Sequence, residues 1–274
     1  MNASASFAQA SLAGRHNPRV KDLRRSLALG VKTARNQIAI EGLLLLGEAV
    51  RSGLRIDAVF LQSSFDSPLG ELPLAGVEIL RLPDEVFRGA VATAHPQGIA
   101  ALVRAPDWPQ EMLFRGAPLV VVAGALQDPG NLGTLVRSAE AFGATGMIAL
   151  PGTVSPWNAK ALRASSGSAF RLPIFPLTAE EAFALLRGRG LRIFAASPRS
   201  SPMERAAAPD LTQPAALLLG NEGAGLPDCW TALADAPVTI PCPGPVESLN
   251  AAIAGSILLY EAARQRRDRD RVAR

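Results

Sequence analysis

The C-terminal half of the chain carries three loops rich in glycine and polar residues, each between a strand-like apolar run and a helix start. These loops lie within residues 128–143, 217–227 and 240–260. Glycine lets a ligand approach backbone N–H and C=O groups closely, and the prolines within residues 241–245 stiffen the wall of the third loop. The repeated arrangement predicts a small-molecule site built from these loops.

Residues in these loops match three family motifs in order. The matching residues are Asn131, Arg137, Ser138, Glu140 and Gly143 in the first, Gly220, Asn221, Glu222, Gly223 and Gly225 in the second, and Ile240, Pro241, Gly244, Ser248, Leu249 and Asn250 in the third. Over roughly residues 118–267 the chain thereby resembles the SpoU (TrmH) family of RNA ribose 2′-O-methyltransferases, within the knotted SPOUT class. Residues 38–103 resemble more loosely the family's substrate-binding domain, a small ribosomal-protein-like α/β module.

The resemblance implies a deep trefoil knot in which the second and third loops form a bent pocket for S-adenosylmethionine. Five residues are implied as cofactor contacts, largely through backbone atoms: Gly220, Asn221, Gly225, Ile240 and Leu249. The knot is an implication of the resemblance alone, because a local pattern cannot reveal one and true knots are very rare among folds.

The implied reaction is an in-line displacement in which a ribose 2′-oxygen attacks the sulfonium methyl group. Positioning dominates such a step, because the donor must be held about 3 Å from the nucleophile. The resemblance gives Arg137 the place beside the attacking oxygen. We expect its guanidinium to stabilise the developing negative charge, because its very high intrinsic pKa makes it a poor general base. The other implied catalytic residues are Asn131, Glu222, Ser248 and Asn250.

These residues also have plainer interpretations. Arg137 could form a surface or interface salt bridge, and Asn131 could cap a helix. Ser248 and Asn250 are common capping residues too, and Glu222 could merely favour a helix N-terminus. The resemblance would instead make Glu222 organise the loops around Arg137, and would make Ser248 and Asn250 align the substrate.

Two other classes of function stay open at this point. A catalytically silent RNA-binding or ribosome-assembly factor could keep the same fold, although retention of the implied catalytic residues argues against it. A dinucleotide-dependent oxidoreductase is disfavoured, because Gly220, Gly223 and Gly225 form G-x-x-G-x-G rather than the usual G-x-G-x-x-G.

Basic segments suggest a polyanionic partner. Residues 15–35 hold seven arginines and lysines against a single acid, and residues 154–173 add further cations. The predicted RNA-binding residues are Arg15, Arg19, Lys21, Arg24, Arg25, Lys160 and Arg163. The alternative for residues 15–35 and for the C-terminal tail is a solvated helix face. The alternative for residues 154–173 is a helix packed on the sheet with Trp157 as an anchor. In the Arg-rich tail at residues 264–274, acids dilute the charge.

Apolar runs and turn signals predict the secondary structure. In the N-terminal part we expect helices at residues 11–30 and 41–53 and strands at residues 56–61, 77–82 and 99–104. In the C-terminal part we expect strands near residues 119–124, 146–150, 172–175, 191–196, 215–219 and 237–240, alternating with helices. The fold class is therefore α/β, with a small N-terminal α/β domain and a C-terminal parallel sheet covered on both faces, to which the resemblance adds the SPOUT knot.

The expected division has four parts. They are a basic N-terminal arm or helix at residues 1–36, an RNA substrate-binding domain at 37–104, a linker at 105–118 and a SPOUT methyltransferase domain at 119–274. The prediction of a linker rests on three prolines and on the lack of a regular hydrophobic periodicity in this segment. A chain of 274 residues with 48% hydrophobic content can bury two cores.

Composition bears on partners and location. Two cysteines and two histidines without ligand spacing predict no bound metal. No apolar run approaches the roughly 20 residues of a membrane span, and the N-terminus lacks a signal-peptide pattern, so we expect a cytoplasmic protein without a membrane partner. The resemblance implies a homodimer that acts on RNA, with ribosomal RNA favoured over transfer RNA and no DNA partner expected.

Overall fold

The structure, a computed structural model, describes residues 11–67, 69, 72, 74–91, 93–197, 209–221, 223, 225–246 and 248–272. Its described residues fall into two compact units. The first unit holds the residues up to Asp107 together with Ser155–Arg171, and the second holds Trp108–Val154 and the residues from Leu172 onward. Each unit contains one sheet.

This division differs from the predicted one in two places. Much of the expected linker belongs to the second unit, because η1 (Gln110–Phe114) forms there and its Leu113 is fully buried in that unit's core. Ser155–Arg171 leaves the expected methyltransferase domain and joins the first unit, where Ala159 packs in the core. The order of residues along a chain does not show which core a helix completes, so the sequence pattern did not indicate that this segment packs in the first unit.

The first unit is built on a five-stranded mixed sheet of order β1-β4-β3-β5-β2. Its strands are β1 (Ser11–Leu12), β2 (Gln37–Glu41), β3 (Ile56–Gln62), β4 (Glu78–Leu82) and β5 (Ile99–Arg104). Strand β5 is antiparallel to β2 and β3, and the other pairs are parallel. The predicted strands at β3, β4 and β5 are confirmed. The prediction missed β2, whose five residues are all buried and lead directly into the next helix.

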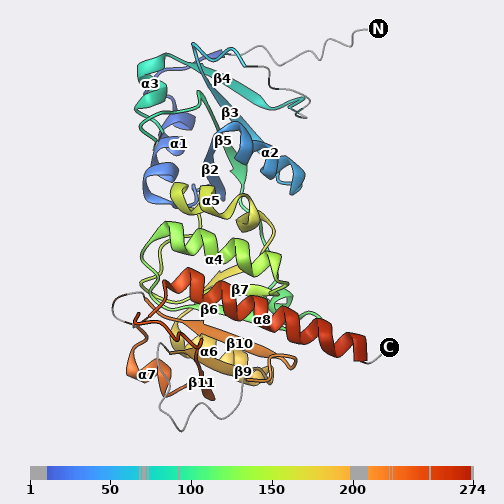
Figure 1. Cartoon of the computed structure of the whole chain (residues 1–274). Helices are drawn as coiled ribbons and strands as arrows, with labels where there is room; N and C mark the ends of the chain where they lie inside the picture. The colour runs from blue at the N-terminus through green and yellow to red at the C-terminus, as the bar shows by residue number, and fades with distance from the viewer. Residues whose placement is uncertain are drawn as a thin grey trace. The chain divides into compact units, whose positions relative to one another are not determined.

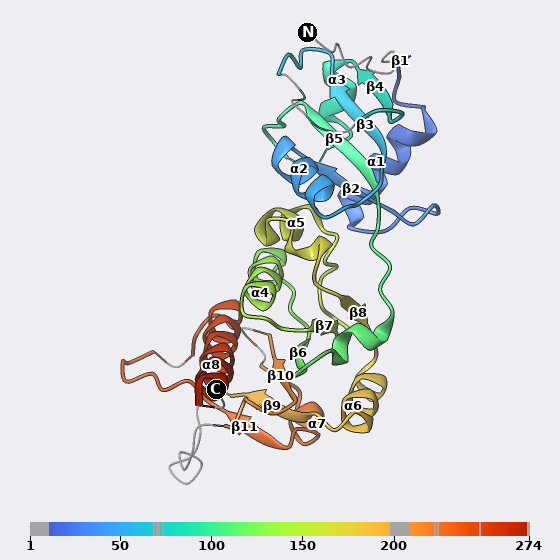
Figure 2. The same ribbon diagram turned by 90° about the vertical axis from the view of Figure 1, so that its right-hand side faces the viewer.

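The first unit's helices cover both faces of this sheet. They are α1 (Pro18–Leu29), α2 (Leu43–Arg51), α3 (Asp84–Arg88), α5 (Ala159–Ser165) and the short η2 (Ser168–Phe170). Figure 2 shows α1 and α2 on opposite sides of the sheet. The helix expected at residues 11–30 begins only at Pro18, because the Asn17 side chain accepts a hydrogen bond from the backbone N–H of Arg19 and so caps it.

Several contacts fasten residues 155–171 within the first unit. The Ser155 hydroxyl donates to the carbonyl of Gly30 at 2.6 Å, and Asn158 caps α5. The Arg171 guanidinium donates to the Glu48 carboxylate at 2.9 Å. Hydrogen bonds from Arg51 and then Arg171 lower the pKa of Glu48. Trp157 is buried, but in the first unit rather than on the C-terminal sheet.

The second unit is built on a six-stranded, all-parallel sheet of order β11-β9-β10-β6-β7-β8. Its strands are β6 (Leu119–Ala123), β7 (Gly146–Ala149), β8 (Ile174–Pro176), β9 (Arg192–Ala196), β10 (Ala215–Leu219) and β11 (Ala236–Val238), and its helices are α4 (Pro129–Ala141), α6 (Ala179–Gly188), α7 (Asp228–Thr231) and α8 (Ala251–Val272). All six predicted strands are confirmed. Helix α6 lies on one side of the sheet and α4 and α8 lie on the other (Figure 2).

Helices α4 and α8 pack side by side (Figure 1). The hydroxyls of Ser138 and Ser256 lie 2.7 Å apart, and one turn further on the rings of Phe142 and Tyr260 meet edge to face at 5.7 Å. A Cβ added at Gly255 would lie 2.5 Å from the Leu135 side chain, so this glycine permits the close approach. These contacts run in the same chain direction, so both helices begin at the same edge of the sheet.

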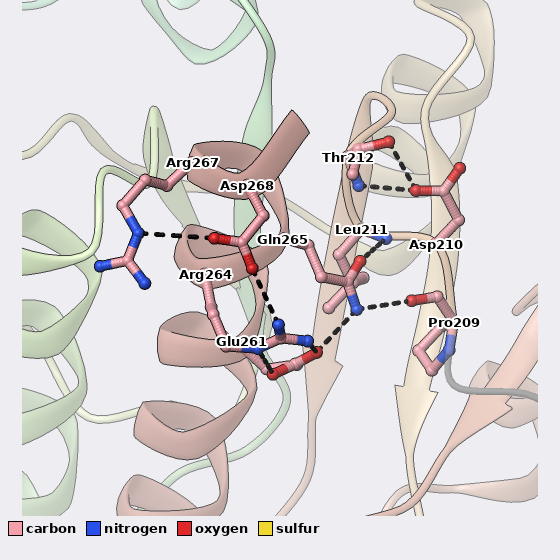
Figure 3. A network of polar contacts seen from close by, with 9 residues as sticks. All are labelled: Pro209, Asp210, Leu211, Thr212, Glu261, Arg264, Gln265, Arg267 and Asp268. Atoms are coloured by element: carbon pink, nitrogen blue, oxygen red, sulfur yellow. Dashed lines mark hydrogen bonds and ion pairs between the residues drawn. The ribbon is translucent and has the colours of Figure 1, made fainter. Parts of the chain in front are cut away.

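Polar contacts anchor the C-terminal half of α8 to residues 209–213, which precede β10 (Figure 3). Arg264 pairs with Glu261 at 2.8 Å, which lowers the pKa of that carboxyl and raises the pKa of Arg264. Arg266 donates to the carbonyl oxygens of Leu211 and Pro118, and its burial lowers its pKa. Arginines of the tail therefore hold backbone in place.

Candidate functional site

A cavity of about 780 Å³ lies at the carboxyl edge of the second unit's sheet. Strands β9, β10 and β11 are neighbours and parallel, so the loops that follow them meet at this edge. The lining includes Ala196 at the end of β9 and Ser197 after it, residues from the loop after β10, and residues from the loop between β11 and α8. The second and third loops singled out in the sequence thus converge, and the start of α8 closes the cavity.

The loop after β10 is shaped by tight backbone contacts. Asn221 and Gly225 exchange backbone hydrogen bonds of 3.1 and 3.0 Å, and the Asn221 amide donates to the carbonyl of Ala125 at 3.1 Å. A Cβ on Gly220 would lie 2.6 Å from the carbonyl carbon of Gly225, so only glycine fits there. Gly220, Asn221 and Gly225 all line the cavity, and the Asn221 side chain is used to hold the loop.

The loop between β11 and α8 supplies the opposite wall. Ile240, Ser248 and Leu249 line the cavity, so all five predicted cofactor-binding residues lie around this one cavity. The Asn250 side-chain oxygen accepts hydrogen bonds from the first turn of α8, at 3.0 Å from the Ala252 nitrogen. Its predicted capping role is confirmed.

The first loop reaches the same edge through α4. The cap of α4 is Asp128, whose carboxylate accepts from the Asn131 backbone N–H at 2.9 Å; the predicted cap at Asn131 is therefore wrong. Pro129 suits the first helical position, which moves the helix start ahead of Asn131. The Asn131 side chain instead accepts a hydrogen bond from the Asn250 amide at 3.1 Å, so two predicted catalytic residues touch.

The remaining predicted catalytic residues differ in position. Ser248 lines the cavity. Arg137 lies on the exposed face of α4 and is absent from the residues that line the cavity in the described part of the chain. Glu222 lies outside the described residues.

The cavity also contains residues that the sequence analysis did not single out, among them Asp235 and Cys242. The Asp235 carboxylate accepts a hydrogen bond from the Ile193 backbone N–H at 2.7 Å and ties β9 to the turn before β11. Cys242 is exposed and unbridged, as is Cys229, which is not among the lining residues.

The residues present fit S-adenosylmethionine. A volume of about 780 Å³ lies within the range of small-molecule sites. Glycine-lined backbone allows close contact with an adenine edge or a ribose. Among the described residues, the Thr239 hydroxyl beside Ile240 is buried without a hydrogen-bond partner, so the third loop holds unused polar capacity next to the cavity.

The predicted RNA-binding residues all belong to the first unit, because α5 is part of it. Six of them are exposed: Arg15, Lys21, Arg24, Arg25, Lys160 and Arg163. Arg19 is partly buried and its guanidinium pairs with Glu78 at 3.2 Å. The cations of α5 thus share one body with those of α1, which the sequence order did not indicate.

The described residues contain no group of three or more histidine, cysteine, aspartate or glutamate side chains placed to hold a metal ion. No helix in the described part of the chain is long and apolar enough to cross a membrane.

Two family patterns match the sequence. The pattern of the SpoU rRNA Methylase family matches residues 118–260, and that of the MRM3-like substrate binding domain matches residues 17–101. The chain is also 31% identical to the 23S rRNA (guanosine(2553)-2′-O)-methyltransferase RlmP of Bacillus subtilis, over 89% of this chain and 95% of that protein.

Solved structures resemble the whole chain. A structure of an RNA 2′-O ribose methyltransferase matches with a TM-score of 0.75 and 29% identity, covering 94% of this chain and 99% of that one. The SpoU methyltransferase AviRb from Streptomyces viridochromogenes, in complex with AdoMet, also matches with a TM-score of 0.75, at 27% identity, covering 91% of this chain and 98% of that one.

Proposed function

Because the chain belongs to the SpoU rRNA methylase family, we propose that it transfers a methyl group from S-adenosylmethionine to a ribose 2′-hydroxyl of ribosomal RNA. The observation that carries this function is the single cavity into which the second and third family motifs converge. The proposed nucleophile is a ribose 2′-hydroxyl, which RNA has and DNA lacks, so the proposed substrate is RNA. The relative RlmP carries 23S rRNA in its name, which favours ribosomal RNA over transfer RNA and a cytoplasmic site of action.

The chain's own residues position the reaction. When bound, S-adenosylmethionine supplies an electrophilic methyl group on a positively charged sulfur. Gly220, Gly225, Ile240 and Leu249 hold the cofactor through backbone atoms, while Asn221 keeps the second loop in shape. The knot implied by the resemblance is part of this proposal. A rigid cradle serves the reaction, because an in-line displacement depends chiefly on holding the reacting atoms in place.

The proposed reacting end lies where α4 and α8 begin. The contact between Asn131 and Asn250 fixes the two helix starts together, and Ser248 faces the cavity beside them. Arg137 stabilises the negative charge that develops on the 2′-oxygen, and a phosphate or water takes the proton. Glu222 organises the loops around this arginine.

The direct test is to map 2′-O-methyl groups on ribosomal RNA from cells with and without the protein, alongside calorimetry with S-adenosylmethionine. We expect one ribose methylation to vanish with the protein and the purified chain to bind the cofactor. Cofactor binding without any lost methylation would favour a silent RNA-binding factor. Failure of a well-folded chain to bind the cofactor would overturn the function.

A homodimer completes the site in this proposal. Helix α8 buries Ala252 and Leu259 but leaves Ile253, Ile257 and Tyr260 exposed, at the spacing of one helical face. This outward stripe is proposed to pack against a second copy. Arg137 does not line its own chain's cavity in the described residues, so we propose that the second copy brings its Arg137 to that cavity.

Charging the stripe is expected to separate the copies. Ile253→Glu should convert a dimer into a monomer, because an unpaired carboxylate in an apolar interface costs several kcal/mol. Size-exclusion chromatography with light scattering measures the mass. Leu44→Glu is the control, since Leu44 is an exposed aliphatic residue on α2, at 65% against 52% for Ile253, and it should leave the mass unchanged. A monomeric wild-type chain, or a dimeric Ile253→Glu variant, would contradict the interface.

A further inference from the structure

The first unit holds a cavity of its own, with a volume of about 630 Å³. It lies at the end of the sheet where β2, β3 and β4 begin and β5 ends, as its lining by Gln37, Ile56, Val77 and Arg104 shows. Four arginines line it: Arg19, Arg35, Arg55 and Arg104. Of these four, only Arg19 is among the predicted RNA-binding residues. Arg35 ends the basic segment at residues 15–35, and Arg55 and Arg104 lie at strand ends.

A buried carboxylate holds two of these guanidinium groups in place. The Asp57 side chain is 6% exposed and lies 2.9 Å from Arg55 Nε and 3.2 Å from Arg104 Nη2. The amide of Gln37 donates to the same carboxylate. One negative charge therefore orients two cations at the cavity wall and leaves part of their charge and hydrogen-bonding capacity unused.

The other two arginines add to this positive charge. Arg19 Nε pairs with Glu78 at 3.2 Å, while Arg19 Nη1 is buried without a hydrogen-bond partner among the described residues. The side chain of Arg35 is exposed and forms no ion pair within the described chain. Arg104 Nη1 donates to the Arg35 backbone carbonyl at 2.7 Å, which fixes the backbone that carries this side chain. Four guanidinium groups against the carboxylates of Asp57 and Glu78 leave two net positive charges.

We propose that this cavity is a binding site for backbone phosphates of the RNA substrate, an inference that rests on the proposed function. A guanidinium offers a planar fork of donors that matches a phosphate, and the carboxylate behind it holds the fork ready. The exposed basic side chains of α1 belong to the same unit, so a polyanionic chain could engage both. The cavity lies in the unit that lacks the cofactor cavity, so its role is to hold substrate.

The test removes the two arginines whose loss leaves Asp57 paired. The double variant Arg35→Gln and Arg55→Gln keeps Arg104 on the carboxylate, and Arg55 is 76% exposed, so the fold is expected to survive. The control is Arg51→Gln with Arg88→Gln, which removes the same charge from the same unit at side chains 62% and 64% exposed and outside the cavity. If the double variant unfolds at a clearly lower temperature than the wild type, Arg35→Gln alone is tested instead, because it breaks no ion pair among the described residues.

Binding of transcribed 23S ribosomal RNA is measured between about 50 and 200 mM salt. We expect the cavity variant to lose about tenfold in affinity at low salt, and its slope of log K against log salt to fall by about one to two. The control should change far less, and calorimetric binding of S-adenosylmethionine should be unchanged in both. If the cavity variant matches the control in affinity and slope while the wild type binds and methylates the RNA, this inference is overturned and the proposed function stands. If the wild type itself fails to methylate ribosomal RNA, the proposed function fails.

Discussion

Arg137→Lys is expected to slow methyl transfer about 100-fold or more, because lysine keeps the charge but loses the planar fork aimed at the developing oxyanion. The affinity for S-adenosylmethionine should change little, because lysine keeps the positive charge and the proposed role of Arg137 is toward the 2′-oxygen of the substrate. Single-turnover transfer to ribosomal RNA measures the chemical step, and calorimetry measures cofactor binding. Arg189→Lys, at an exposed arginine on the same unit, is the control and should transfer at the wild-type rate. Near-wild-type transfer by Arg137→Lys would contradict the role.

A mixing experiment tests whether this arginine acts on the other copy's cavity. Arg137→Ala lacks the arginine, and Gly220→Ala has a damaged cavity. In a mixed dimer one of two sites would combine an intact cavity with an intact arginine, so equal mixing should recover roughly a quarter of wild-type activity. If each arginine served its own chain's cavity, every mixed dimer would stay inactive.

Gly220→Ala is expected to weaken cofactor binding by about 10-fold to 100-fold, because overpacking typically costs about 1–3 kcal/mol. The new Cβ would lie 2.6 Å from the carbonyl carbon of Gly225 and 2.8 Å from Leu226 Cγ, so the loop must open or the cavity must change shape. Isothermal titration with S-adenosylmethionine measures the affinity, and thermal melting shows whether the fold holds.

Gly223→Ala is the matched control for Gly220→Ala. It is a glycine of the same loop, and a Cβ there would meet its nearest neighbour, the Asn221 side-chain oxygen, at 3.6 Å, an ordinary contact. We therefore expect nearly wild-type affinity from Gly223→Ala. Equal affinities for the two variants would show that the close contact between Gly220 and the Gly225 backbone does not shape the cofactor site.

The sequence alone predicted the second unit's sheet well, because strong apolar runs separated by glycine and proline mark buried parallel strands. All six strands were found within a few residues. It was less successful in the first unit, where β2 lies buried against the next helix and β1 has only two residues. Local patterns are weakest where a strand is short or has no exposed side.

The cofactor residues were also within reach of the sequence, because their motifs are made of residue types that act through backbone. Gly220, Ile240 and Leu249 do surround one cavity. Their convergence, however, depends on β9, β10 and β11 being neighbours, and strand order is set by long-range packing. Asp235 was missed for the same reason, since its place in the wall follows from its hydrogen bond to Ile193 on another strand.

By itself, then, the order of residues determined which loops carry chemistry and where the strands run, because both are encoded by neighbours along the chain. Only the tertiary structure decided that residues 155–171 join the first unit, that Asn131 contacts Asn250 instead of capping its helix, and that Arg35, Arg55 and Arg104 line one cavity with Asp57. Each of these depends on contacts between residues far apart in sequence. Their partners are chosen by burial and charge compensation, which no local pattern records.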